Sequence, residues 1–492
     1  MMNGREKSDL GVVAGKPTNK AGKPAAEWGE PRPETKENAE QQSKHRAQDR
    51  ARVSQALDRV RQAARQRKKE RFTALLHHVS VDALRIAFYG LKRRAAPGVD
   101  GVTWQDYEAE LEPRLRDLHE RVHRGAYRPQ PSRRTFIPKA DGKHRPLAIS
   151  ALEDKIVQGA TVMVLNAIYE GDFCGFSYGF RPGRGPHDAL DALCVAIDQR
   201  KVSWIVDADI QNFFGSVSRE WLVRFLEHRI GDTRIIRLIQ KWLKAGILED
   251  GIVTVDDRGT GQGSVISPLL ANIYLHYVLD LWAERWRRRE AAGDMIIVRY
   301  ADDVTIGFEH EDDACRFLDA MRVRFEEFEL SLHPDKTRLI EFGRLAAVNR
   351  KQRGLGKPDS FAFLGFTFIC GKSRTGRFQL QRKTRGDRMR AKLKDVKAQM
   401  QRRMHWSIPE QGKWLAQIVS GHFEYFAVPT NFRALQTFRY HVTDLWRSTL
   451  RRRSQKDGYT WERVAKLAAD YLPRPHIRHP WPSARFAVSH PR

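Results

Sequence analysis

The sequence predicts an α+β protein in which a small antiparallel sheet carries acidic residues and a helical region follows it. Two segments, 204–214 and 296–308, have the apolar and β-branched composition of strands, and both contain aspartates. Helical apolar spacing surrounds these segments, for example over residues 107–124 and 219–247. Beyond about residue 375, basic and apolar residues alternate with the spacing of a helix bundle.

Length, charge and cysteines limit the class of protein. The chain has 492 residues, enough for two or three domains, and its formal net charge of +27 predicts a polyanionic partner. Nucleic acid is the first candidate and an anionic membrane surface the second. The longest apolar run, 266–282, is interrupted by polar residues and no signal-peptide pattern opens the chain, so no membrane span is expected. The cysteines lie far apart without a Cys-x-x-Cys pair, which indicates reduced thiols in a cytosolic protein and argues against a zinc site.

The N-terminal region is predicted to lie outside the globular part. Residues 1–45 contain few large apolar residues and are expected to be disordered. Residues 46–71 are strongly basic with scattered apolar positions, which indicates an exposed helix. That helix could be an ordinary solvated one or an arm that contacts RNA. From Phe72 onward the pattern is globular.

A basic hairpin is predicted over residues 136–149. Two short apolar segments flank a polar turn, and the hairpin carries Lys139, Lys143 and Arg145. Basic groups placed in this way could hold a triphosphate, although isolated basic residues are more often solvated.

Acidic residues are concentrated at the ends of two predicted strands. Asp302 and Asp303 lie at the turn of a predicted β-hairpin, and Asp207 and Asp209 end a separate strand. Adjacent carboxylates repel each other, and their unpaired burial costs several kcal/mol. Such oxygen ligands suit Mg²⁺, and a third carboxylate from another strand completes the ligand set of a two-metal phosphoryl-transfer site. An ordinary Asp-Asp turn is the alternative if the hairpin is considered alone.

Three further segments accompany the acidic hairpin. Residues 259–275 form a glycine-rich loop that contains Gln262 and leads into a helix. An amphipathic helix is predicted over 312–330, and Lys336 follows it after a turn. Residues 361–368 alternate aromatic and small residues, which is typical of a hairpin.

The C-terminal region combines basic and aromatic residues. Residues 386–404 and 413–450 have the spacing of a helix bundle with one apolar and one cationic face. A basic cluster followed by Trp461 consists of Arg451, Arg452, Arg453 and Lys456. A charge run alone is usually a solvated face, but a basic cluster beside aromatic residues is better explained by binding of structured RNA.

These motifs together resemble the bacterial group II intron-encoded reverse transcriptase/maturases, over roughly residues 70–482. The motifs are the loop 96–101, Tyr178-Gly-Phe-Arg-Pro-Gly-Arg184, the run 259–275, Tyr300-Ala-Asp-Asp303, Gly421-His-Phe-Glu-Tyr-Phe426 and Leu450-Arg-Arg-Arg-Ser-Gln-Lys456. Gly215 stands where the family usually has Asp, and Gly261 where many relatives have Pro. No Cys-x-x-Cys pairs or His-Asn cluster of the family's endonuclease follow, so the chain is expected not to cut a second DNA strand.

The resemblance implies a right-hand polymerase with an α-helical thumb and maturase domain. The implied divisions are an N-terminal extension over 1–71, fingers over 72–200, a palm over 201–370, a thumb and maturase region over 371–482, and a tail over 483–492.

The resemblance also implies residue roles. It favours Asp209 over Asp207 as a metal ligand, because the family's ligand precedes Ile. Asp209, Asp302 and Asp303, with the Ile210 carbonyl, would hold two Mg²⁺, for which Mn²⁺ could substitute. Phe214 would lie under the incoming sugar and select deoxynucleotides. Nucleotide contacts are implied for Lys139, Arg145, Gln262 and Lys336, and template or RNA contacts for Arg181, Arg451, Arg452, Arg453 and Lys456.

The implied activity is RNA-directed DNA synthesis from dNTPs on an RNA template with a DNA primer. The implied partners are the parent group II intron RNA, whose splicing the protein would assist, and target DNA during retromobility. Such a protein is expected in the bacterial cytoplasm, associated with the nucleoid or a ribonucleoprotein, and it could form a homodimer. Two alternatives stay open, a domesticated reverse transcriptase (for example in antiviral defence) and a splicing factor with a decayed polymerase, against which the complete acidic triad argues.

Overall fold

The computed structural model of the chain describes residues 36–138, 144–249, 252–255, 258–261, 263–453 and 458–489. Contacts divide the chain into two units, 1–48 and 49–492, and the second contains all three sheets. Helix α1 (Lys36–Gln66) begins earlier than predicted, so the expectation of disorder is wrong for residues 36–45. Residues 1–35, which carried the same prediction, lie outside the described residues.

Helices and one β-hairpin form the chain from residue 72 to residue 200. The helices are η1 (Leu76–His78), α2 (Val81–Tyr89), α3 (Trp104–Glu108), α4 (Leu111–His123), α5 (Leu152–Tyr169) and α6 (Pro186–Gln199). The predicted hairpin is confirmed as β1 (Ser132–Pro138) paired antiparallel with β2 (His144–Ile149). Thr103 and Asp106 form a capping box that starts α3, because each satisfies a backbone N–H of the other.

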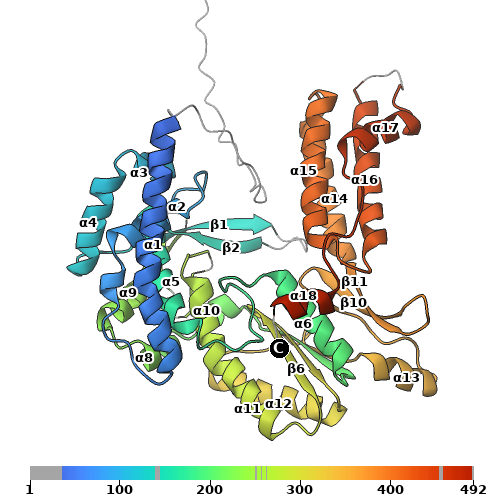
Figure 1. Cartoon of the computed structure of the whole chain (residues 1–492), viewed down its shortest axis with the longest axis horizontal. Coiled ribbons are helices and arrows are strands. Elements are labelled where there is room, and N and C mark those ends of the chain that lie inside the picture. Colours follow the sequence, from blue (N-terminus) through green and yellow to red (C-terminus); the bar gives the residue numbers. More distant parts are fainter. Residues whose placement is uncertain are drawn as a thin grey trace, which may run out of the picture. The chain divides into compact units, whose positions relative to one another are not determined.

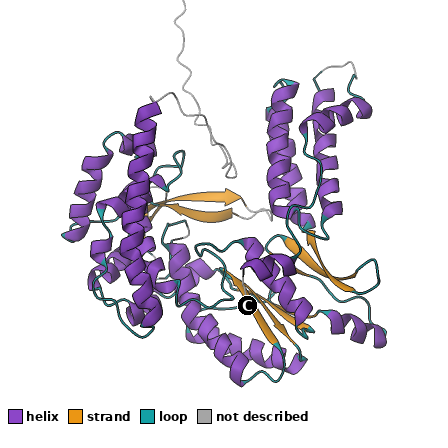
Figure 2. Ribbon diagram, viewed as in Figure 1, coloured by secondary structure: helices purple, strands orange, loops and turns teal. Residues whose placement is uncertain are grey.

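The two acidic segments belong to one four-stranded antiparallel sheet, as predicted (Figure 2). Its strands, in spatial order, are β6 (Met295–Tyr300), β7 (Asp303–Phe308), β3 (Trp204–Asp209) and β8 (Arg338–Glu341). Neighbouring residues of β3 point to opposite faces, so Val206 joins the core cluster that contains Phe317 of α12 (Glu311–Glu327), and Ile205 joins the cluster that contains Leu193 of α6. Both faces of the sheet are therefore covered by helices (Figure 1).

Further helices and two short strands connect β3 with β6. They are α7 (Phe213–Ser216), α8 (Arg219–Arg229), α9 (Thr233–Lys244), β4 (Ile247–Glu249), β5 (Ile252–Thr254), α10 (Ser267–Leu275), the π turn η2 (His276–Asp280) and α11 (Leu281–Arg289). Strands β4 and β5 extend the basic hairpin into a second sheet, in the order β2-β1-β4-β5. The predicted helix after the glycine-rich loop is confirmed as α10, which begins with Ser267 and Pro268.

The remaining chain forms a third sheet and a helix bundle. The elements are α13 (Arg344–Gln352), β9 (Phe361–Phe363), β10 (Phe366–Lys372), β11 (Phe378–Thr384), α14 (Gly386–Arg402), α15 (Ile408–Phe426), α16 (Phe432–Arg451), α17 (Trp461–Tyr471) and α18 (Pro482–Ser489). Helices α14 to α17 share an apolar core, which confirms the predicted bundle. Within the described residues, no helix is long and apolar enough to span a membrane. The divisions into fingers, palm and thumb stay predictions.

Candidate active site

The two strands of the acidic hairpin pair up to the residues that flank its turn. Tyr300 ends β6 opposite Asp303, which begins β7, so Ala301 and Asp302 form a two-residue turn. Ala301 has a φ of 57°. Two-residue hairpin turns require positive φ at the first turn position, a conformation that costs a residue with a side chain about 1–3 kcal/mol. The hairpin therefore presents both aspartates at its tip through a strained backbone.

Asp209 lies beside this tip. Strand β3 pairs antiparallel with β7, and the register places Asp209 directly opposite Asp303. Opposite residues in such a pair have Cβ atoms about 4.5–5.5 Å apart. The structure thus brings together the three carboxylates predicted to be catalytic, Asp209, Asp302 and Asp303.

Burial and repulsion disturb the protonation of this acidic group. Burial, followed by the charges of Asp302, Asp209 and Asp207, raises the pKa of Asp303 to about 7. The guanidinium of Arg388 on α14 opposes this shift. Because a cation of high charge stabilises the ionised carboxylates, the acidic group favours binding of such a cation.

Basic side chains on and before β8 lie against two of the aspartates. Lys336 Nζ lies 2.8 Å from Asp209 Oδ2, and Arg338 Nη2 lies 3.3 Å from Asp207 Oδ2. The Lys336 side chain is 61% exposed, so a phosphate entering from solvent can reach its ammonium group. The structure therefore places Lys336 at the acidic site, and it places an arginine on Asp207, the carboxylate not chosen as a metal ligand.

The backbone around Ile210 is fixed by the segment that follows α12. Gln211 N donates to Ser331 O at 2.9 Å, and His333 N donates to Asp209 O at 2.8 Å. The Ile210 side chain is buried in the core. The role of its carbonyl as a metal ligand stays a prediction.

The acidic residues fit a hard divalent cation by their chemistry, since three carboxylates offer only oxygen ligands. Searched over the residues that the structure describes, the chain has no group of three or more His, Cys, Asp or Glu side chains already arranged to hold a metal ion. Lys336 is instead the partner of Asp209. This ammonium group would compete with a cation for Asp209, and metal binding is a proposal.

Phe213 and Phe214 occupy different environments. Phe213 is buried in the core, whereas Phe214 lines a cavity of about 560 Å³. Gly215 follows, and a Cβ there would lie 3.0 Å from Asn212 Cγ, so the Asn212 side chain fills the space beside it. Of the two rings, Phe214 is thus the one that borders open space, as the predicted sugar contact requires.

The glycine-rich loop forms another wall of this cavity. Gln158 of α5 accepts hydrogen bonds from Ser264 Oγ at 2.9 Å and Val265 N at 3.0 Å, which ties the loop to α5. Gly263 has a φ of 114°, and a Cβ there would lie 2.6 Å from Ala148 O of β2. Only glycine permits this close approach.

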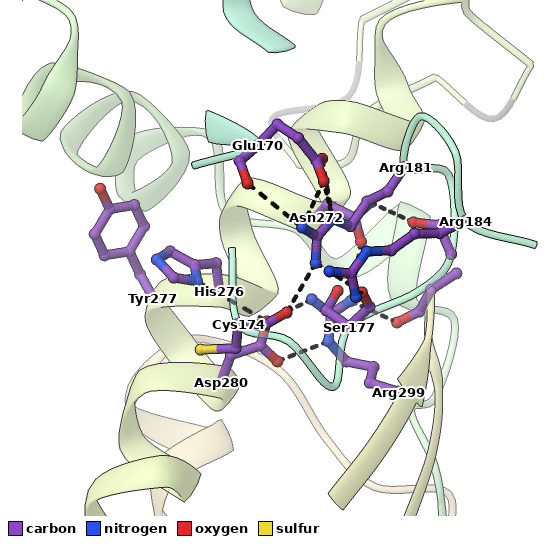
Figure 3. Close-up of polar contacts among 12 residues, drawn as sticks. Glu170, Cys174, Ser177, Arg181, Arg184, Asn272, His276, Tyr277, Asp280 and Arg299 are labelled. Atoms are coloured by element: carbon purple, nitrogen blue, oxygen red, sulfur yellow. Dashed lines mark hydrogen bonds and ion pairs between the residues drawn. The ribbon is translucent and has the colours of Figure 1, made fainter. Parts of the chain in front are cut away.

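Arg181 does not contact solvent, and its predicted role is corrected. Its side chain is 2% exposed, and Nη2 lies 2.6 Å from Glu170 Oε1 (Figure 3). Nη1 donates to the carbonyls of Cys174 at 2.8 Å and Ser177 at 2.7 Å. The arginine therefore holds its own loop in place, and the prediction that it contacts template is wrong for this structure.

Several predicted residues cannot be placed. Lys139, Gln262 and Lys456 lie outside the described residues, and Arg145 is described only through its backbone in β2. Their predicted nucleotide and RNA contacts stay predictions.

The described part of the C-terminal basic cluster lies at the end of α16. Arg451 and Arg452 are exposed, and Arg453 donates to the Trp406 carbonyl. Arg451 and Arg452 therefore lie at the surface of the helix bundle, whereas Arg453 is half-buried.

Sequence reasoning missed Arg338 and Arg388 near the aspartates. Arg338 reaches Asp207 because β8 pairs with β3, and this pairing has no local sequence signal. Arg388 is one of many basic residues on an exposed helix, so residue type alone does not distinguish it.

Comparisons with known proteins give consistent results. Residues 137–368 match the family described as reverse transcriptase (RNA-dependent DNA polymerase). The chain is 33% identical to the protein YkfC of Escherichia coli over 58% of this chain and 78% of YkfC. It is also 33% identical to the group II intron-encoded protein LtrA of Lactococcus lactis, over 46% of this chain but only 38% of LtrA.

A third relative is a protein in the cob intron of Schizosaccharomyces pombe, 44% identical over 30% of this chain and 18% of that protein. The acidic hairpin, the strand that ends in Asp209 and the glycine-rich loop all lie within the matched family segment. The chain therefore belongs to the reverse transcriptase family, among the group II intron-encoded reverse transcriptase/maturases.

Proposed function

We propose that this protein is an RNA-directed DNA polymerase that also binds a group II intron RNA, assists its splicing and supports its mobility. The observation that carries the polymerase proposal is the register of β3 and β7, which sets Asp209 beside the Asp302–Asp303 tip. A decayed polymerase would have no need to keep three mutually repelling carboxylates at one end of a sheet. The intact acidic group therefore favours the active enzyme over a decayed one.

Asp209, Asp302 and Asp303 would hold two Mg²⁺ ions. When bound, such ions promote attack by the primer 3′-hydroxyl and neutralise charge on the pyrophosphate that leaves. The chain's own residues position the reactants. Phe214 would pack under the sugar, and Lys336 would exchange its contact with Asp209 for one with the nucleotide phosphates.

The reaction joins the primer to one nucleotide. The 3′-oxygen forms a bond to the α-phosphorus of the dNTP, the bond from that phosphorus to the bridging oxygen breaks, and pyrophosphate departs. The hydroxyl proton is lost to solvent. Lys336 can donate a proton to the leaving pyrophosphate, because its ammonium lies within the same site.

Intron RNA would bind the basic surface of the helix bundle. One side of α14 packs through Val396 and Met400, and its other side exposes basic residues, namely Arg390, Lys394 and Lys397. Arg451 and Arg452 add charge at the end of α16. Such a surface binds phosphates largely through counterion release, so we expect binding to weaken steeply with salt. The relative named as a group II intron-encoded protein supports an intron RNA as the partner.

Primer extension on an RNA template with Mg²⁺ and dNTPs tests the polymerase proposal. The wild type should extend the primer, and Asp209→Asn should lose the activity because a neutral amide is a poor ligand for Mg²⁺. Asp207→Asn should retain more activity, because Asp207 already pairs with Arg338. Equal losses for both variants would contradict the choice of Asp209 as the ligand.

A further inference from the structure

A buried arginine, Arg299, lies two residues before the acidic turn in the sequence and faces Asp280 (Figure 3). Arg299 belongs to β6, where the residues before it are apolar, and its side chain is 0% exposed. Its Nε and Nη2 donate to the two carboxylate oxygens of Asp280 at 2.7 and 2.5 Å. Its Nη1 donates at 2.9 Å both to Asn272 Oδ1 and to the carbonyl oxygen of Ala301. The guanidinium therefore connects two helical residues with the hairpin turn.

The hydrogen bond to the Ala301 carbonyl acts on the turn that carries Asp302. A peptide unit is planar, so the oxygen of Ala301 and the nitrogen of Asp302 move together. The same turn is strained at Ala301, whose φ is 57°. A strained turn persists only where its surroundings hold it. The Arg299 hydrogen bond supplies one such restraint, on the peptide that leads into Asp302.

The partners of Arg299 are themselves fixed. Asp280 ends the π turn η2 and is 0% exposed, and Asn272 belongs to α10. Asn272 Nδ2 donates to Gly179 O at 2.7 Å. A Cβ at Gly179 would overlap the nitrogen of Ala301. The turn is thus held both by the arginine and by the loop at Gly179, and Asn272 links the two restraints.

Stability alone does not account for this arrangement. Desolvating an arginine and a carboxylate is expensive, and well-packed apolar residues often serve as well or better in a buried position. The planar guanidinium, however, can reach an acid, an amide and a carbonyl at fixed angles at once. The hydrogen-bond geometry therefore favours a role in orientation.

We propose that Arg299 is a positioning residue, which sets the orientation of the Ala301–Asp302 peptide and thereby aligns Asp302 and Asp303. For its effect on catalysis this proposal rests on the polymerase function proposed above. Its effect on the hairpin does not depend on that function, so the two can be tested separately.

The test compares Arg299→Lys with Arg229→Lys in the full-length protein. Lysine keeps a positive charge beside Asp280 but has a single nitrogen, so it cannot make all the contacts of the guanidinium. Arg229 is a matched control because it is also buried, with an ion pair to Asp172 at 2.7 Å and a hydrogen bond to the Glu70 carbonyl at 2.7 Å. Among the residues that the structure describes, its hydrogen-bond partners are Asp172 and the carbonyls of Arg67, Glu70 and Ala64, which all lie outside the hairpin.

Two readouts separate positioning from general stability. Amide hydrogen exchange of the peptide over residues 295–308 should become faster in Arg299→Lys and stay unchanged in Arg229→Lys. In primer extension, Arg299→Lys should lower kcat by about tenfold or more with the KM for dNTP changed less than about twofold, the pattern of a defect expressed in the transition state. Arg229→Lys should keep the wild-type kcat, although its melting temperature is similar to that of Arg299→Lys.

The proposal is overturned if Arg299→Lys exchanges its hairpin amides at the wild-type rate, or if Arg229→Lys loses kcat equally. Should Arg299→Lys not fold, Asn272→Ala decides the question, because it removes one hydrogen bond to Arg299 and one to Gly179 without leaving a charge unpaired. Faster hairpin exchange in Asn272→Ala supports positioning, and unchanged exchange contradicts it. An inactive wild type would contradict the polymerase proposal alone, since the exchange measurement still tests Arg299.

Discussion

Gly179 packs against Ala301, the first residue of the acidic turn. A Cβ on Gly179 would overlap the Ala301 nitrogen and lie 2.9 Å from the Tyr300 carbonyl carbon. These atoms are backbone, so the turn rather than a flexible side chain would have to move. Asp302 and Asp303 can therefore occupy their positions only if residue 179 has no side chain.

Gly179→Ala should accordingly displace the hairpin tip and lower the rate of primer extension. A misplacement of about 1 Å at a reacting centre can cost up to ~100-fold in rate, so we expect a loss of at least about tenfold. Gly175→Ala is the control, because a Cβ at Gly175 would have no atom of the described residues within 4 Å apart from those of its chain neighbours. Similar rates for the two variants would show that the contact does not constrain the turn.

Phe214→Ala should allow ribonucleotides into the growing strand. Removing the ring opens the cavity that Phe214 lines, and with it the steric barrier to a 2′-hydroxyl. We expect the preference for dNTP over rNTP, measured as the ratio of kcat/KM values, to fall on the order of tenfold or more.

Phe213, the neighbour of Phe214, should affect stability and not the choice of sugar. Phe213 is 3% exposed, so Phe213→Ala should lower the free energy of unfolding by about 3–5 kcal/mol and leave the sugar preference of the remaining active protein unchanged. Unchanged discrimination in Phe214→Ala would place the sugar contact elsewhere and weaken the assignment of Asp209.

Replacing Arg451, Arg452 and Arg453 together by Gln should weaken binding of intron RNA. Loss of three phosphate contacts should reduce the slope of log affinity against log salt by about 2. Filter binding over a range of salt concentrations measures this slope. A second arginine triplet, Arg287-Arg288-Arg289 at the end of α11, offers a control with the same change in charge. An equal effect of both replacements would point to net charge rather than to the end of α16.

Acid should destabilise the protein in part through His187. Burial, followed by the charges of His479, Arg485 and Arg382, lowers the pKa of His187 to about 3. Because the folded pKa lies below the ordinary value near 6.5, His187 favours the folded state above pH 6.5, and this contribution is lost as the pH falls toward 3. Between pH 7.5 and pH 5, the free energy of unfolding of His187→Phe should therefore fall less than that of the wild type. The two decreases should differ by at most about 2 kcal/mol, and solvent screening makes the difference smaller.

Chemical denaturation at the two pH values measures this difference. His441 is exposed on α16, so His441→Phe should keep the pH dependence of the wild type. An unchanged pH dependence in His187→Phe would contradict the assignment.

Local sequence patterns predicted the acidic hairpin, the strand that ends in Asp209 and the C-terminal bundle. Strands buried on both faces have continuous apolar residues. Where an acidic pair separates two such apolar segments, the turn is expected at the acidic pair. The choice of Phe214 over Phe213 comes from the resemblance. The structure places Phe214 on a cavity, and its contact with the sugar stays a prediction. The helix α18 and the early start of α1 had no comparably strong pattern.

Long-range pairing explains what the sequence did not reveal. Arg181 and Arg299 are both single arginines near motif residues, and only the folded chain shows that each is buried on an acid. The sequence motif therefore suggests a template contact for Arg181, whereas the folded chain pairs this arginine with Glu170. The ion pair of Arg338 with Asp207 and the effect of the Arg388 charge on Asp303 likewise depend on elements that are distant in sequence from these aspartates.

Asp302 is proposed to serve DNA synthesis, whereas a separate surface binds RNA. The most direct test measures primer extension on an RNA template, and RNA binding in the same samples, for the wild type, Asp302→Ala and the exposed control Asp312→Ala. We expect Asp302→Ala to abolish extension but to bind RNA with nearly wild-type affinity, while Asp312→Ala retains both. Extension by Asp302→Ala at the wild-type rate, or its loss of RNA binding together with extension, would show that these roles are wrongly assigned.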